Sequence, residues 1–247
     1  MKKLIILLML AGISSSVIAK DYAEYKQERL IAKILNQQVK KHRSIKSSVH
    51  SILSRYPEKV DVVMSVALER YPEKYRQIML GALSAEPVLA CDVIENVIKA
   101  DVAPSSELVK IAIKAEPAYA QEIVNTAVQY SPSELENIVR VAIRTEPYDM
   151  NNIVNNTATS YPSKVLDILT AAITAIPEQA TNIVKEILAL FPQEAETVVT
   201  TAVTESTDDH NKGIVNAAID SGFDKDSAIA AAIAGGAKKE TLAKLNN

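Results

Sequence analysis

Ten prolines recur along this chain at a nearly constant spacing. Each lies fifteen residues after the previous one, apart from Pro104, which is displaced by two. Proline suits the first turn of a helix because its φ is already near helical, and it disrupts a helix interior because it has no N–H. The spacing therefore predicts a row of short α-helices separated by tight turns. The ten are Pro57, Pro72, Pro87, Pro104, Pro117, Pro132, Pro147, Pro162, Pro177 and Pro192.

The apolar residues follow the same period. Counting from Pro57 in steps of fifteen, positions 6 and 7 are aliphatic or Met, position 10 is mostly Ala, and position 11 is mostly Leu, Ile or Val. Together with position 3 they form one stripe of an α-helix, and no alternation of period two is present. We expect an all-α fold, an α-solenoid with a right-handed superhelix. It would contain about thirteen short antiparallel helices, arranged as hairpins of about thirty residues.

The first nineteen residues have the pattern of an export signal. Lys2 and Lys3 precede an apolar run, and small residues lead to Ala19. The sequence predicts a cleaved signal peptide over 1–19 and a periplasmic or secreted mature protein. The alternative is an uncleaved membrane anchor, but the run is shorter than the ~20 residues that a span needs. We therefore expect no transmembrane segment after cleavage.

Three further segments follow the signal peptide. Residues 20–41 form a basic segment that we expect to be a helical cap, and residues 42–206 form the repeat solenoid. Residues 207–247 read as atypical capping repeats and a tail, because Thr207 and two aspartates replace the expected proline and the helices become Ala-rich. A solenoid needs such atypical ends to cover its open core.

Alternate helices differ at position 9, and this difference indicates a binding face. One set is polar there and includes Asn96 and Asn156, whereas the other set has Gly81, Ile111 and similar residues and should be the more buried layer. Asparagines recurring every thirty residues would form a ladder of amides, which donate and accept hydrogen bonds at once. Such a ladder suits a peptide backbone or a glycan; the alternative is a solvated helix face without a ligand. The candidate amides are Asn96, Asn125, Asn155 and Asn156.

Carboxylates recur just before three of the prolines. Glu86, Glu116 and Glu146 are spaced by thirty residues. They would lie near helix N-termini, where the helix dipole favours negative charge. A row that binds a cation or a basic peptide is the functional alternative.

The two ends of the mature chain carry opposite charge. Residues 20–55 have nine Lys or Arg against three Asp or Glu, and residues 193–226 have eight Asp or Glu against two Lys. Basic and acidic ends favour head-to-tail association, for which we select Lys40, Lys41, Arg43, Asp208 and Asp209. The alternatives are solvated caps and, for the basic segment, contact with an anionic membrane surface. Nucleic acid is not an expected partner, because the body is acidic and the chain carries an export signal.

The sequence contains few residues for catalysis. His210 beside Asp208 and Asp209 is a weak metal cluster, and Cys91 has no His in its own repeat region. We therefore expect no enzyme, no cofactor and no metal. The function that the pattern favours is an exported, non-enzymatic scaffold that binds another protein in the bacterial envelope. The alternative is a structural protein that assembles head to tail into surface or matrix filaments.

Overall fold

The computed structural model describes residues 25–41 and 43–242, so the predicted signal peptide lies outside the described residues. The chain divides into two compact units, Met1–Val102 and Ala103–Asn247, and each is described by itself. The division lies within the segment that we treated as one array. It falls two residues before the displaced Pro104, where Asp101 has a φ of +50°.

The described part of the first unit is entirely helical. A helix over residues 25–40 is followed by four helices: α2 (Ile45–Leu53), α3 (Val60–Arg70), α4 (Tyr75–Ala85) and α5 (Ala90–Lys99). The helix over 25–40 occupies most of the segment that the sequence assigns to an N-terminal cap.

The second unit continues the pattern with ten helices. Within residues 103–242 no strand is present, which agrees with the predicted all-α class. The helices are α6 (Ser105–Ala115), α7 (Ala120–Tyr130), α8 (Leu135–Thr145), α9 (Met150–Ser160), α10 (Val165–Ala175), α11 (Ala180–Leu190), α12 (Ala195–Thr204), α13 (Asp208–Asp220), α14 (Lys225–Ala234) and α15 (Lys239–Leu242).

The prolines begin the helical segments, as predicted. Each proline except Pro104 is the first residue of a three-residue 3₁₀ turn that leads directly into an α-helix, and Pro104 is itself the N-cap of α6. The residue before each such proline has left the helix; Glu146, for example, has φ −130° and ψ 75°. A residue that precedes proline is kept out of the α region by the proline ring, so each helix ends there.

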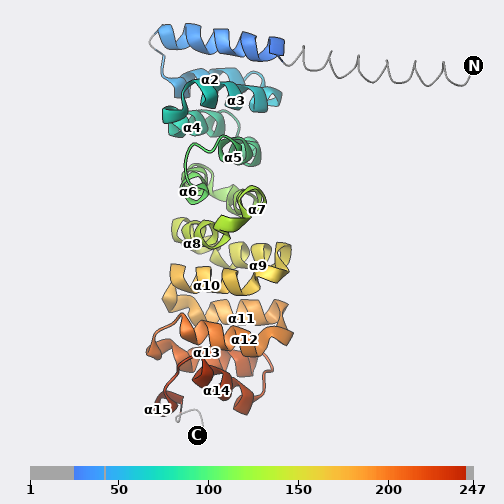
Figure 1. The fold of residues 1–247 in the computed structure, drawn as a ribbon, viewed down its shortest axis with the longest axis vertical. Coiled ribbons are helices and arrows are strands. Elements are labelled where there is room, and N and C mark those ends of the chain that lie inside the picture. Colours follow the sequence, from blue (N-terminus) through green and yellow to red (C-terminus); the bar gives the residue numbers. More distant parts are fainter. Residues whose placement is uncertain (1–24, 42, 243–247) are drawn as a thin grey trace, which may run out of the picture. The chain divides into compact units, whose positions relative to one another are not determined.

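Within each unit the helices form two layers. Each of the helices α2 to α15 packs most extensively against a helix two positions away along the chain, so α7, α9 and α11 lie in one layer and α8, α10 and α12 in the other (Figure 1). Hydrogen bonds between side chains that are about thirty residues apart join neighbours within a layer. This is the packing of a helical-repeat solenoid.

The core consists of the residues that the repeat places at positions 3, 6, 7, 10 and 11. Ile123, Val124 and Ala127 of α7 are fully buried, and so are Ile138, Val139 and their counterparts in the other helices. Each buried aliphatic side chain of this size contributes about 1.5–3 kcal/mol to the stability of the folded chain. The predicted apolar stripe is confirmed. At position 9, Gly81, Ile111 and Ala171 are buried, whereas Asn96 and Asn156 are half-buried. Val141, the fourth member of the apolar set, is half-buried as well, so the expected difference between the layers does not extend to it.

Gly81 lies where α4 makes a close contact with α2. A Cβ at this position would lie 2.6 Å from the main-chain oxygen of Lys46 in α2 and 3.1 Å from the Cβ of Val49. No side chain fits at this contact without moving α2 away from α4.

Candidate functional site

Three of the four candidate asparagines lie together in the second unit. Asn125 on α7 and Asn155 and Asn156 on α9 are half-buried, and they join Gln121 of α7 and Glu186 of α11 in a line of polar contacts. We call these five residues the amide seam. It connects three successive helices of one layer.

The hydrogen bonds between α7 and α9 have a defined direction. Gln121 donates from Nε2 to the carboxylate of Asp149 at 3.5 Å, which leaves its Oε1 to accept from Asn156 Nδ2 at 3.1 Å. Asn156 Oδ1 then accepts from Asn125 Nδ2 at 2.6 Å. Because a carboxylate can only accept, Asp149 sets the orientation of all three amides.

The seam continues from α9 to α11. Asn155 Nδ2 donates to Glu186 Oε2 at 2.7 Å, and Tyr161 at the end of α9 donates its hydroxyl to the main-chain oxygen of Asn125 at 3.1 Å. Two acceptors are left over: Asn125 Oδ1 and Asn155 Oδ1 are buried and have no hydrogen-bond partner. Burial also raises the pKa of the Tyr161 hydroxyl, which keeps it protonated as a donor.

The asparagines of the predicted ladder therefore hydrogen-bond neighbouring helices to one another, and they also contribute to a polar surface. Hydrogen bonds within the chain already engage the donors of Asn125, Asn155 and Asn156. A ligand that used these amides would have to displace contacts between repeats. The exposed residues beside the seam are more accessible to a partner.

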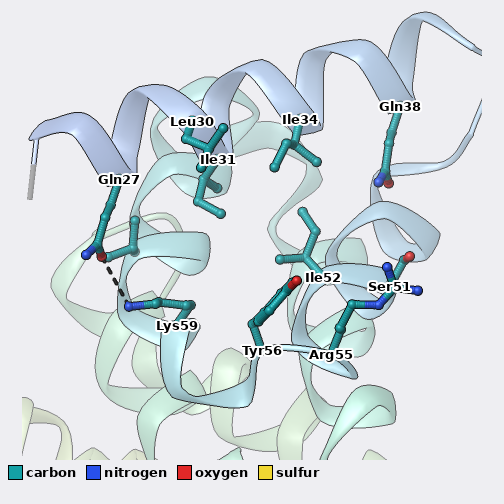
Figure 2. A pocket seen from close by; sticks show the side chains of 11 residues that line it. Gln27, Leu30, Ile31, Ile34, Gln38, Ser51, Ile52, Arg55, Tyr56 and Lys59 are labelled. Carbon is teal, nitrogen blue, oxygen red and sulfur yellow. Dashed lines mark hydrogen bonds between the residues drawn. The ribbon is translucent and has the colours of Figure 1, made fainter.

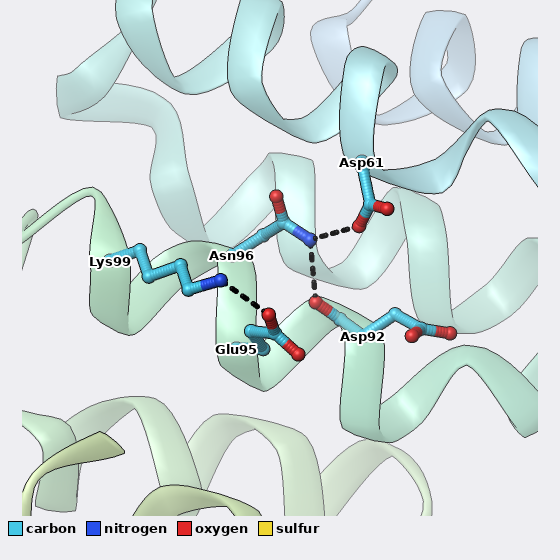
Figure 3. A network of polar contacts seen from close by, with 5 residues as sticks. All are labelled: Asp61, Asp92, Glu95, Asn96 and Lys99. Atoms are coloured by element: carbon cyan, nitrogen blue, oxygen red, sulfur yellow. Dashed lines mark hydrogen bonds and ion pairs between the residues drawn. The ribbon is translucent and has the colours of Figure 1, made fainter. Parts of the chain in front are cut away.

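Asn96 occupies the equivalent position in the first unit (Figure 3). Its Nδ2 donates to Asp61 Oδ1 of α3 at 2.9 Å and to the main-chain oxygen of Asp92 at 2.8 Å, and Lys99 pairs with Glu95 next to it. Asn96 thus joins α3 to α5 just as the seam joins α7 to α9.

Asp92 lies in the same acidic region. Burial raises the pKa of its carboxyl, and the negative charges of Asp61 and Glu95 raise it further. Ionisation of this carboxyl is therefore less favourable in the folded protein than in water.

Glu86, Glu116 and Glu146 all lie at the junction of two elements. Each is the C-cap residue of one helix and the N-cap residue of the following 3₁₀ turn, and its main-chain oxygen, not its carboxylate, accepts the hydrogen bond of that turn. The three side chains are half-buried and cap no N–H group. Their proposed role in binding a cation or a basic peptide stays a prediction.

The charged residues selected for head-to-tail contact are exposed. Lys40 ends the helix over 25–40, Lys41 and Arg43 lie between that helix and α2, and Asp208 and Asp209 begin α13. Asp208 is paired with Lys238, and this contact raises the pKa of the lysine.

Residues suited to catalysis or metal binding are sparse. His210 contacts Thr207 Oγ1 at 3.1 Å through Nδ1, and Cys91 is a half-buried free thiol. Among residues 25–41 and 43–242, no three His, Cys, Asp or Glu side chains are grouped so that they could hold a metal ion. In the same stretch no helix has the length and apolar character required to cross a bilayer.

The surface of α9 is the feature that the sequence reasoning did not select. This helix contains no charged residue, and its exposed side chains are the amides of Asn151 and Asn152 and the hydroxyls of Thr159 and Ser160. Next to it, Tyr148 in the turn Pro147–Asp149 is 100% exposed. The signal was present in the segment MNNIVNNTATS, which differs from every other repeat in having neither acid nor base.

Two shallow hollows flank α9. One, of about 400 Å³, is lined by the polar residues Gln121, Asn152, Asn155, Asn156, Thr159 and Ser160. The other, of about 380 Å³, lies beside Tyr148 and includes Asn151 and Ile176. We call the exposed residues of α9 together with Tyr148 the neutral face.

No protein-family model, curated protein or solved structure matches this chain.

Proposed function

We propose that this chain is a non-enzymatic, exported scaffold of the bacterial envelope that binds another protein through the neutral face. The export part of the proposal depends on the signal peptide predicted from residues 1–19. The observation that carries the binding part is the charge-free surface of α9 beside a fully exposed tyrosine.

The absence of charge on α9 matters because solvated repeat surfaces usually carry charge. Its neighbours follow that rule: α7 exposes Glu122 and α11 exposes Lys185. The cores of protein interfaces are depleted in charged residues, since a charge that loses water without gaining a partner is costly. Amides and hydroxyls give up less hydration and can donate or accept according to the partner.

Tyr148 adds the anchor that such a face requires. Tyrosine is enriched at interfaces and among the few residues that contribute most of a binding free energy, because its ring buries a large apolar area and its hydroxyl stays hydrogen-bonded. A side chain that is wholly exposed in the free chain can lose all of that area to a partner.

The proposal can be tested by capturing proteins from an envelope extract with the wild type and with variants changed at single exposed residues. The purified protein would be immobilised, and bound proteins identified by mass spectrometry. We expect a specific partner that is retained by the wild type and lost with Tyr148→Ala and with Asn152→Arg. The reason is that the first change removes the anchor and the second places a bulky charged side chain in the interface.

Asn216→Arg is the matched control, because Asn216 is likewise an exposed asparagine and lies on α13, away from the neutral face. It should retain the partner. Equal capture by the wild type, Asn152→Arg and Tyr148→Ala would refute this face as the binding site.

Head-to-tail assembly is the second function that an observation favours. Lys40, Lys41 and Arg43 are exposed near one end of the chain, and Asp209 is exposed near the other. The proposal predicts that the particle mass grows with protein concentration. It should fall with added salt, because salt screens the attraction between opposite charges on exposed ends. A monomer at every protein concentration in light scattering at low salt would refute head-to-tail assembly.

A further inference from the structure

An apolar cavity of the first unit lies beneath the helix over residues 25–40 (Figure 2). It has a volume of about 410 Å³, at the lower end of the range for small-molecule pockets. Leu30, Ile31 and Ile34 line it from that helix, and Ile52 and Tyr56 line it from α2 and the residues that follow it. We call this cavity the N-terminal groove.

Two apolar residues of the groove are left open. Leu30 is 57% exposed and Tyr56 is 52% exposed, whereas Ile31 and Ile52 of the same groove are buried. Each Å² of apolar surface that a bound aliphatic chain removes from water contributes about 25 cal/mol to the free energy of binding. An apolar ligand can therefore bury apolar surface here that no side chain of the protein covers.

The polar groups of the groove are placed at its two ends. In Figure 2 Gln38, Ser51 and Arg55 lie on one side, whereas Gln27 and Lys59 lie on the other, with the aliphatic side chains between them. Gln38 Oε1 is buried without a partner. An amide in this state can turn to present either its acceptor or its donor to a ligand.

The charge of the groove has one sign. Its only charged lining residues are Arg55 and Lys59, and neither forms an ion pair with a residue in the described part of the chain. Lys59 makes one long hydrogen bond, at 3.4 Å, to Gln27. An arginine without a counter-ion beside an apolar cavity is complementary to an anion that carries an apolar tail.

We propose that the N-terminal groove binds a free long-chain carboxylate of the fatty-acid class. The hydrocarbon chain lies between Leu30, Ile34 and Ile52, and the carboxylate accepts hydrogen bonds from the guanidinium of Arg55, with Gln38 and Ser51 beside it. The cavity is a concave groove between helices with room for one hydrocarbon chain, which fits a single free molecule better than the flat surface of a bilayer. This binding is independent of the neutral face.

Isothermal titration calorimetry of the purified protein with dodecanoate, below its micelle concentration, tests the proposal. We expect saturable binding of one dodecanoate per chain. Arg55→Gln should weaken dodecanoate binding about tenfold, the effect of removing one charge-assisted hydrogen bond at a partly exposed site. The same variant should bind dodecanol, which has no charge, as the wild type does.

Two variants separate this site from general effects. Leu30→Gln should weaken the binding of dodecanoate and dodecanol alike. Because Leu30 is exposed, the variant should fold as the wild type does, which circular dichroism checks. Arg70→Gln is the matched control, because Arg70 is an exposed arginine at the end of α3 that does not line the groove. It should leave both affinities unchanged.

Each of three results would overturn the proposal. The first is no heat of binding with dodecanoate. The second is equal weakening by Arg55→Gln and Arg70→Gln, which would indicate attraction by net charge alone. The third is binding to vesicles of anionic phospholipid, but not of neutral phospholipid, with no binding of dodecanoate; the groove would then be part of a membrane-contact surface.

Discussion

Replacing Gly81 with alanine tests the contact between α2 and α4 directly. The new Cβ would lie 2.6 Å from the main-chain oxygen of Lys46, where ordinary van der Waals contact begins at 3.4 Å. Two further atoms of α2, the Cβ of Val49 and the Cα of Lys46, lie at 3.1 and 3.2 Å. Because two of the three obstacles are main-chain atoms, no side-chain rotation relieves the contact, and α2 must move by roughly 0.8 Å.

Two opposing effects determine the size of the change. Alanine is favoured over glycine in a helix interior by about 1 kcal/mol. Overpacking of a close contact costs about 1–3 kcal/mol, and a main-chain obstacle belongs at the upper end of that range. We expect Gly81→Ala to lower the free energy of unfolding by about 1–2 kcal/mol, measured by urea titration followed by circular dichroism.

Gly213 of α13 provides the matched control. A Cβ there would meet only the side chain of Thr181, with its Oγ1 at 2.4 Å and its other atoms at 3.6 Å or more. In a Thr181→Ala background, Gly213→Ala should therefore stabilise the chain by about 1 kcal/mol through helix propensity alone. A gain of similar size from Gly81→Ala would show that α2 and α4 do not approach as described.

Three further predictions concern polar residues. Asn156→Ala should lower the free energy of unfolding by about 1–3 kcal/mol, because it leaves Asn125 Nδ2 and Gln121 Oε1 on α7 without a hydrogen-bond partner, whereas the exposed Asn151→Ala should change it little; urea titration compares them. Asp92→Asn should raise the melting temperature at neutral pH, since the raised pKa means that the charged form destabilises the fold, and the difference should vanish well below pH 3.8. Hydrogen bonds from the main chain and the hydroxyl of Ser227 lower the pKa of Asp224 at the N-cap of α14. The melting temperature of Asp224→Ala should thus fall below that of the wild type at neutral pH and approach it as the pH drops below 3.8.

The fold was predictable because two independent patterns coincide. Prolines mark the starts of the helices, and the apolar positions of the repeat identify the buried stripe. Because both patterns have the same period, each supports the helix boundaries that the other predicts. The 3₁₀ turns were not predicted, because proline at a first helical position is compatible with either helix type. The division between the two units had a signal in the displaced Pro104, but the displacement of one proline does not by itself indicate a boundary.

The candidate site was predicted only in part. The sequence places Asn125 and Asn156 on the same layer, but whether they face solvent or each other depends on how far neighbouring helices are shifted along their axes. A shift of a few ångströms decides between a free amide and one that is bonded at 2.6 Å. The residue spacing does not contain that quantity.

The N-terminal groove escaped prediction for a different reason. The helix over residues 25–40 has no proline and no fifteen-residue pattern, so its charge dominated the interpretation. Leu30, Ile31, Ile34 and Leu35 nevertheless follow helical spacing. That apolar stripe was the available signal for a helix that covers α2.

The stacking of helices thirty residues apart is the central claim, and cross-linking tests it most directly. In a Cys91→Ala background, the pair Asn125→Cys and Asn156→Cys would be treated with a short bismaleimide and analysed by peptide mass spectrometry. We predict an efficient link within one chain, because the two native side chains are hydrogen-bonded across α7 and α9. The pair Asn125→Cys and Asn137→Cys is closer in sequence but lies in different layers, and it should not react. Linkage of the second pair in preference to the first would contradict the solenoid.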